Sequence, residues 1–112
     1  MKRNELPPRA GRNVRFRQLA RLMRALGNES RLTIVDRLSH GACCVCELAE
    51  FTGLDQSTVS RHMSTLEGSG LVSRERRGQH VYFRLSAPWV KELLDAHSTT
   101  ACDTGEATAN EV

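Results

Sequence analysis

Residues 53–71 read GLDQSTVSRHMSTLEGSGL, and this stretch decides how the rest of the chain is interpreted. Asp55 suits a helix N-cap, because its carboxylate can accept hydrogen bonds from the unpaired amides of a first helical turn. Val59, Met63 and Leu66 recur at steps of four and three residues, which predicts a helix with one apolar face. We therefore expect a helix that buries one side and exposes the other.

The opposite face of this predicted helix carries short polar side chains and one arginine, which suit close approach to the DNA major groove. An ordinary amphipathic surface helix has the same pattern, so the neighbouring segments must decide between the two interpretations. The residues predicted to enter the groove are Gln56, Ser57, Thr58, Ser60 and Arg61, with His62 at its margin.

The chain has 112 residues, which is enough for one compact domain, and its formal net charge of +3 permits nucleic-acid binding without establishing it. The charge is unevenly distributed: arginines crowd the first part of the chain, and no Lys or Arg follows Lys91. We therefore predict a flexible basic arm at residues 1–14, a folded domain at residues 15–98 and a flexible acidic tail at residues 99–112.

No stretch approaches the roughly 18 apolar residues of a membrane span, and the first residues lack the apolar core of a signal peptide. These features predict a cytoplasmic protein. In that reducing compartment the four cysteines are expected to be thiols or metal ligands rather than disulfides.

Helical periodicity continues upstream, with one helix ending at Gly27 and a second capped by Asn28. A short helix around residues 47–51 then leads through Gly53 into the helix quoted above, which is the pattern of a helix-turn-helix.

Residues 71–77 and 80–86 alternate apolar and polar side chains around Gly78, which predicts a β-hairpin. Arg77 and Arg84 lie on this hairpin and are candidates for contact with the DNA backbone. A solvated hairpin whose arginines keep its edge soluble is the alternative.

The last predicted helix carries Trp89, Val90, Leu93 and Leu94, and one small domain has little core left to cover it together with the first helix. We infer that both helices pair with their copies in a homodimer. The expected fold is mainly α with a β-hairpin wing, a winged helix-turn-helix that dimerises through its first and last helices.

Three segments resemble the ArsR/SmtB family of metal-responsive bacterial repressors: residues 25–32 (ALGNESRL), 44–48 (CVCEL) and 56–63 (QSTVSRHM). The resemblance covers roughly residues 16–95. It implies a homodimer that binds an operator palindrome without metal, releases it when metal binds and controls a detoxification or efflux operon. It also places Cys44 and Cys46 in the metal box of the family's third helix.

Thiolates are soft ligands that select soft or borderline ions. Cys44 and Cys46 would lie about 200° apart around a regular helix. They can therefore share one ion only if the helix start is distorted or if Cys44 lies outside the first turn. Binding an ion would then strain the short helix that carries Cys46. That helix packs against the helix predicted to enter the DNA groove, which we call the recognition helix, so ion binding and DNA binding would oppose each other.

The arsenic-sensing ArsR branch, which the Cys44–Cys46 box resembles most, binds arsenite or antimonite through three thiolates. The third cysteine common in that branch is replaced here by Ala49. The third ligand therefore stays open between Cys43, which we slightly favour, and Cys102. A two-thiolate site completed by water or a small thiol is a further alternative. The resemblance implies a repressor of an arsenic-resistance operon.

Zinc or cadmium sensing is the nearest rival. Asp95 and His97 resemble half of the family's zinc site, but the matching half, expected near Thr108, is absent, and residues 1–42 contain no cysteine for a cadmium site. We interpret Asp95 and His97 as surface residues. Plain packing of the cysteines, a thiol-redox-responsive repressor and a structural zinc module are further alternatives. A thiol–disulfide enzyme would need Cys-x-x-Cys in a βαβ pattern, so no enzyme is predicted.

Overall fold

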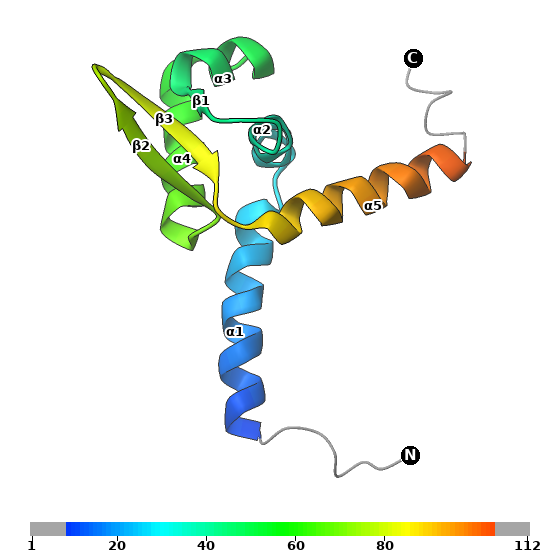
Figure 1. Ribbon diagram of the computed structural model, residues 1–112. Helices are drawn as coiled ribbons and strands as arrows, with labels where there is room; N and C mark the ends of the chain where they lie inside the picture. The colour runs from blue at the N-terminus through cyan, green and yellow to red at the C-terminus, as the bar shows by residue number, and fades with distance from the viewer. Residues whose placement is uncertain (1–8, 105–112) are drawn as a thin grey trace.

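The computed structural model describes the backbone of residues 9–104 and the side chains of residues 14–98. Figure 1 shows a small body built from the middle helices and a sheet, from which the long first and last helices extend. The elements are α1 (Arg9–Leu26), α2 (Glu29–Leu38), β1 (Cys43–Cys44), α3 (Val45–Thr52), α4 (Gln56–Ser69), β2 (Val72–Arg77), β3 (His80–Leu85) and α5 (Pro88–Thr104). This order confirms the predicted winged helix-turn-helix.

The two end helices extend beyond the predicted domain of residues 15–98. Helix α1 begins at Arg9 and runs through Gly11, and α5 ends at Thr104. A single glycine inside a helix costs only about 1 kcal/mol relative to alanine, so it does not stop a helix rich in arginine and alanine. The division into arm, domain and tail remains a prediction.

The start of α2 follows the predicted cap. Asn28 has an extended backbone, and its side-chain oxygen accepts a hydrogen bond of 3.0 Å from the backbone N–H of Arg31. This bond satisfies one amide of the first turn that has no partner inside the helix. The sharp change of direction between α1 and α2 is therefore encoded locally.

The core of the helix-turn-helix lies between α3 and α4. Val59, Met63 and Leu66 of α4 are buried together with Leu48 of α3, as the periodicity of the sequence predicts. Removing each such side chain from water stabilises the fold by about 1.5–3 kcal/mol. Gly53 joins the two helices in the left-handed conformation, with φ of 79°, which glycine adopts without a clash. Burial thus leaves the other face of α4 free.

The predicted hairpin forms, with β2 and β3 antiparallel and Gly78 at its tip. A third strand joins it, because β1 pairs with β3 in the sheet order β1-β3-β2. The sequence does not predict β1, since two residues are too few to show an alternating pattern. This short strand attaches the start of α3 directly to the wing.

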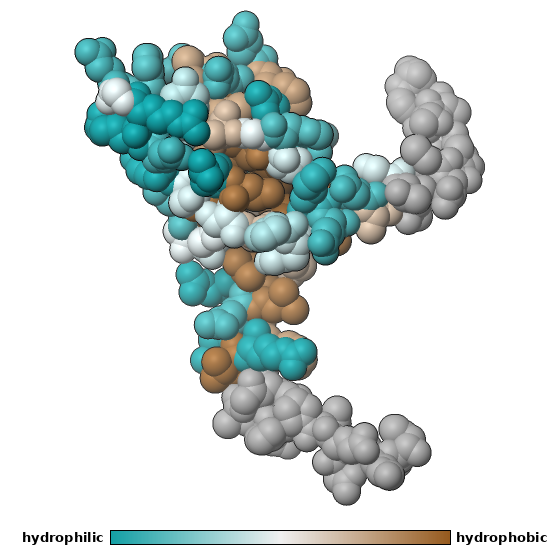
Figure 2. All heavy atoms as spheres, in the orientation of Figure 1, coloured by the Kyte–Doolittle hydropathy of each residue, from teal (hydrophilic) through white to brown (hydrophobic). Residues whose placement is uncertain are grey.

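Large apolar side chains remain exposed along the two end helices. They are Val14, Phe16, Leu19 and Met23 on α1, and Trp89 and Leu93 on α5. Figure 2 shows hydrophobic residues along α1 where it leaves the body of the domain. Such faces match the predicted pairing of the first and last helices with a second copy of the chain. No described helix is both long and apolar enough to cross a membrane.

Candidate functional site

The sulfurs of Cys44 and Cys46 lie 3.3 Å apart at the start of α3. Cys44 is the last residue of β1 and the N-cap of α3, with an extended backbone at φ of −90° and ψ of 171°, whereas Cys46 lies in the first turn. The 200° separation expected within a regular helix therefore does not apply, because Cys44 lies outside the turn. Cys46 is exposed and Cys44 is half-buried, so a small ligand can reach the pair.

The third neighbouring cysteine points elsewhere. Cys43 is fully buried, and successive residues of a strand face opposite sides of the sheet, so its side chain leaves β1 on the side away from that of Cys44. Its sulfur lies 3.9 Å from the carbonyl oxygen of Gly41. Burial is the main cause that raises the pKa of the Cys43 thiol, which further disfavours the thiolate. The structure does not bring Cys43 to the pair.

The pair has no third ligand among the described side chains. No group of three or more His, Cys, Asp or Glu side chains within residues 14–98 is placed to hold a metal ion. The side chain of Cys102, the other predicted ligand, lies outside the described residues. The donor set that the structure assembles is therefore two sulfurs, which suits a soft ligand that takes its remaining donor from elsewhere.

The surroundings of Cys46 favour its protonated thiol at neutral pH. The hydrogen bond between the Cys46 thiol and the sulfur of Cys44, followed by the charge of Cys44, raises the pKa of Cys46 above its ordinary value of 9.0, and the carboxylate of Glu47 adds to this effect. Glu47 stays close because its side chain accepts a 3.1 Å hydrogen bond from the backbone N–H of Cys44. Two adjacent thiols can each lose a proton and form a bond from sulfur to the same soft atom.

Cys44 lies in one row across the sheet with two residues of the wing. It is opposite Tyr82 of β3, and Tyr82 is in turn opposite Glu75 of β2. The guanidinium of Arg77 lies 4.7 Å from the centre of the Tyr82 ring, and it is also 3.4 Å from Glu75. Arg84 pairs with the same carboxylate at 2.9 Å. Both wing arginines predicted to meet DNA therefore lie on the sheet face that carries Cys44.

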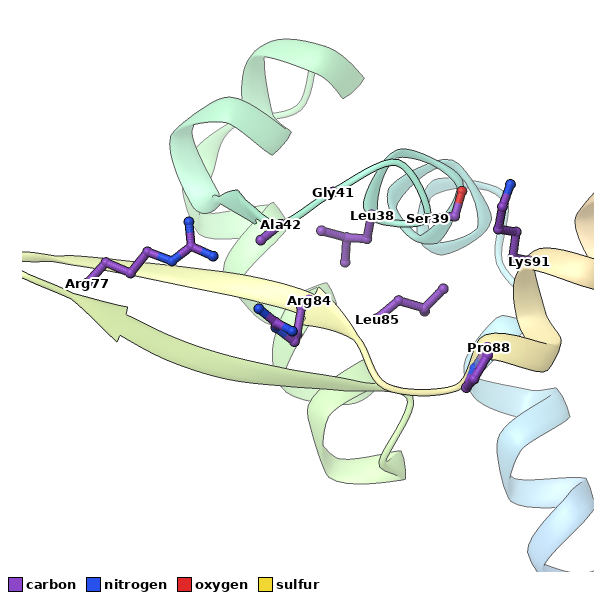
Figure 3. Close-up of a pocket in the computed structure, with 9 residues that line it drawn as sticks. All are labelled: Leu38, Ser39, Gly41, Ala42, Arg77, Arg84, Leu85, Pro88 and Lys91. Carbon is purple, nitrogen blue, oxygen red and sulfur yellow. The ribbon is translucent and has the colours of Figure 1, made fainter.

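The shared carboxylate is strongly influenced by these two cations. A hydrogen bond from Arg77 is the largest of the causes that lower the pKa of Glu75, and Arg84 adds to it. Arg77 and Arg84 also line an open cavity of about 390 Å³ (Figure 3). Its lining residues are Leu38, Ser39, Gly41, Ala42, Arg77, Arg84, Leu85, Pro88 and Lys91, and Figure 3 shows the two arginines on the side of the wing.

The predicted groove residues lie along the free face of α4, where Gln56, Ser57, Ser60 and Arg61 are exposed and Thr58 is half-buried. Arg61 donates a 3.3 Å hydrogen bond to the hydroxyl of Thr58. Asp55 precedes the helix as expected, and its carboxylate accepts a 2.7 Å hydrogen bond from the Ser57 hydroxyl. Hydrogen bonds from Thr58 and then Ser57 lower the pKa of Asp55.

His62 differs from the other groove candidates because it is half-buried and turned toward α2, where its Nδ1 lies 3.2 Å from a guanidinium nitrogen of Arg31. Asp95 and His97, the residues that resemble part of a zinc site, are exposed on α5. Asp95 lies 3.5 Å from the ammonium group of Lys91. Arg31 was not predicted as a site residue, although its place in the segment 25–32 was a signal.

Comparison with known proteins places this geometry in a family. A sequence profile described as bacterial regulatory protein, arsR family, matches residues 28–74. The arsenical resistance operon repressor of Escherichia coli (strain K12) is 41% identical over 80 residues, covering 66% of this chain and 67% of that protein. This chain belongs to the arsR family. Its family relatives are DNA-binding transcriptional regulators and not enzymes.

One further sequence relative and one solved structure are also similar to this arsR-family chain. The HTH-type transcriptional regulator NmtR of Mycobacterium tuberculosis is 38% identical over 78 residues, which are 70% of this chain and 65% of that protein. The solution structure of the homodimeric winged helix-turn-helix DNA-binding domain Mb0332 from Mycobacterium bovis superposes with a TM-score of 0.75 at 32% identity, covering 85% of this chain and 88% of that one. Transcriptional regulators with different names thus share this arsR fold.

Proposed function

We propose that this arsR-family protein represses an arsenic-resistance operon in the cytoplasm and releases its operator when As(III) or Sb(III) binds Cys44 and Cys46. The observation that carries the proposal is the pair of accessible sulfurs, 3.3 Å apart, at the start of the helix that precedes the recognition helix. The similarity to an arsenical resistance operon repressor supports the choice of effector.

The binding step is balanced without an oxidant. Arsenous acid is uncharged at neutral pH, and its condensation with two thiols forms two As–S bonds and breaks two As–O bonds. Each thiol proton leaves with a hydroxide as water. The product keeps one As–O bond, and that position is open to hydroxide, to a small thiol or to Cys102. We infer that Cys44 and Cys46 form the core of the site, because Cys43 is buried on the other side of β1.

The effector would act through the two elements that Cys44 and Cys46 join. Bridging the sulfurs fixes the end of β1 relative to the first turn of α3. Helix α3 packs against α4 through Leu48, and β1 pairs with the wing through Tyr82. A shift at this junction would therefore change the position of the recognition helix relative to the wing. Ligand and DNA then prefer different conformations, and each weakens the binding of the other.

On the DNA side, we propose that a homodimer places two copies of α4 in successive major grooves of an operator palindrome. Arg77 and Arg84 of each wing would contact backbone phosphates. Operator binding then depends on the separation of the two recognition helices, which the dimer sets. The exposed apolar residues of α1 and α5 support the dimer.

The test is a mobility shift with the DNA upstream of the gene, titrated in parallel with arsenite, antimonite, zinc and cadmium under reducing conditions. We expect the metalloids to release the operator from the parent protein, and Cys44→Ser and Cys46→Ser to bind DNA but fail to respond. Release by zinc or cadmium alone would replace the proposed effector. Release that is equal in the parent protein and both variants would exclude the cysteine pair as the sensor.

The short sulfur–sulfur distance also supports a second candidate, a repressor that responds to oxidation of the same pair. Hydrogen peroxide would take two electrons from the two thiols, forming one S–S bond and two molecules of water. Thiol titration after peroxide treatment distinguishes the candidates. A loss of two thiols per chain together with loss of operator binding favours oxidation, whereas arsenite-induced release under reducing conditions favours the metalloid.

A further inference from the structure

Arg31 of α2 reaches two other helices at the point where they meet. Its Nε donates a 2.6 Å hydrogen bond to the carbonyl oxygen of Ala25, and one terminal nitrogen lies 3.5 Å from the carbonyl oxygen of Arg24. The other terminal nitrogen lies 3.2 Å from Nδ1 of His62. Arg31 therefore links the carboxyl end of α1 to the recognition helix.

The contact with Arg31 determines which nitrogen of His62 carries the proton. A guanidinium has five N–H donors and no acceptor, so Nδ1 must accept with its lone pair. A ring nitrogen with a free lone pair carries no proton, and the imidazole is then neutral with its hydrogen on Nε2. The charged groups that act on the ring are Arg31 of α2 and Arg61 of α4. Burial first, and then these two cations, lower the pKa of His62.

The Nε2–H of His62 remains available. Within the described part of the chain, every buried side-chain nitrogen or oxygen has a hydrogen-bond partner. Among the described residues, the His62 ring makes its hydrogen bond to Arg31, and it does so through Nδ1 and not through Nε2. Nε2 is therefore open to solvent, on the recognition helix and next to the exposed Arg61.

We propose that Arg31 is a positioning residue for operator binding, which holds His62 in the Nε2–H form so that His62 donates one hydrogen bond to an acceptor atom of the operator. The inference rests on the proposed operator binding. The acceptor is an oxygen of a backbone phosphate or the N7 atom of a purine edge, which offer the same chemistry to an N–H donor. Arg31 itself need not touch DNA.

The first test examines the free full-length protein by ¹⁵N NMR of labelled histidine between about pH 5 and pH 8, the range in which an ordinary histidine changes charge. We expect His62 to show protonated Nε2 and bare Nδ1 at neutral pH, with a titration midpoint below the ordinary value for histidine. In Arg31→Met the midpoint should move up toward the ordinary value, because one of the cations that lower the pKa of His62 is removed. A wild-type His62 protonated on Nδ1 at neutral pH overturns the proposal.

The second test uses two variants that keep different ends of the imidazole. In His62→Asn the side-chain amide lies near the position of Nδ1, and in His62→Gln it reaches the position of Nε2. We expect His62→Asn to lose roughly three- to tenfold in operator affinity, the order of one hydrogen bond, and His62→Gln to lose less. Thermal unfolding by circular dichroism verifies that both variants fold.

The outcomes separate this inference from the function on which it rests. Equal operator affinity of wild type, His62→Asn and His62→Gln overturns the role of His62 alone. Failure of the wild type to bind any upstream fragment overturns the proposed function and this inference with it.

The source of the acceptor is identified with modified operators, because a variant and a modification that remove the same hydrogen bond are not additive. One operator carries methylphosphonate linkages at the margin of the groove, and another carries 7-deazapurines. The acceptor is the group whose modification abolishes the difference in operator affinity between wild type and His62→Asn. If neither modification reduces that difference, the proposed contact with DNA is wrong.

Discussion

The sulfurs of Cys44 and Cys46 lie 3.3 Å apart because the chain changes from strand to helix between them. Cys44 belongs to β1 and pairs with Tyr82, whereas Cys46 belongs to the first turn of α3. A ligand that binds both sulfurs therefore connects the wing and the helix-turn-helix at the point where they meet. Two cysteines at these positions of one regular helix would point in nearly opposite directions and could not bind one ligand together.

The separation of Cys43 from the pair can be tested with matched variants. We expect Cys44→Ser to lose the arsenite response while operator affinity changes by less than about twofold. Cys43→Ala should keep the response and lose stability by about 1 kcal/mol, since it removes a buried sulfur. Operator release by arsenite and urea denaturation measure the two effects. Loss of the response in a folded Cys43→Ala protein would make Cys43 a ligand.

The dependence on pH should distinguish arsenite from cadmium. Because the pKa of the Cys46 thiol lies above its ordinary value, this thiol is protonated at neutral pH. Cadmium must displace the thiol protons, so its apparent affinity should rise as pH rises from about 6 to 8. Condensation of arsenous acid releases water and no net proton, so its affinity should change little over that range. Isothermal titration at several pH values gives both slopes, and an equal rise for the two ligands would contradict this chemistry.

Removal of the carboxylate shared by the wing arginines should strengthen DNA binding. Glu75→Gln leaves Arg77 and Arg84 without their anionic partner and removes a charge that would repel phosphate. We expect operator affinity to rise several-fold at low salt and the advantage to shrink as salt increases. Glu67→Gln is the matched control, because Glu67 of α4 pairs at 2.8 Å with Arg74 of β2, a different arginine of the wing. Equal effects of the two substitutions would place Arg77 and Arg84 away from the DNA.

The buried face of the recognition helix should dominate stability. Met63 is 1% exposed, so Met63→Ala leaves a cavity in the core and is expected to lower the free energy of unfolding by about 2–5 kcal/mol. Thr65→Ala, on the exposed side of the same helix, should change it by less than about 0.5 kcal/mol. Urea denaturation measures both. A small effect of Met63→Ala would mean that α4 packs less tightly than its burial indicates.

The exposed apolar residues of α1 should hold the homodimer. Leu19 and Met23 are 44% and 41% exposed in the single chain, and replacing both with Glu should dissociate the dimer at micromolar concentration. Operator affinity should then fall by at least about tenfold, because two half-sites are no longer bound together. Sedimentation velocity gives the oligomeric state. Gln18→Glu is the control, since Gln18 faces a shallow cavity beside Ser69, and a dimer that survives the double substitution would refute the assignment.

Local patterns in the sequence were sufficient for most of the architecture. The spacing of Val59, Met63 and Leu66 predicts the buried face of α4, and Asn28 predicts the start of α2, because periodicity and capping depend on neighbouring residues. The two alternating segments around Gly78 predict the hairpin for the same reason. The resemblance to a family of repressors was also available from short motifs.

The sequence by itself determined which residues are apolar, which cap a helix and which thiols stand close together along the chain. Tertiary structure alone decided that Cys43 and Cys44 face opposite sides of β1, that Cys44 stands in one row with Tyr82 and Glu75, and that Arg31 reaches His62. Cys44 and Tyr82 are 38 positions apart in the sequence, and Arg31 and His62 are 31 positions apart. Pairing across a sheet and between helices depends on packing in space, which no local pattern contains.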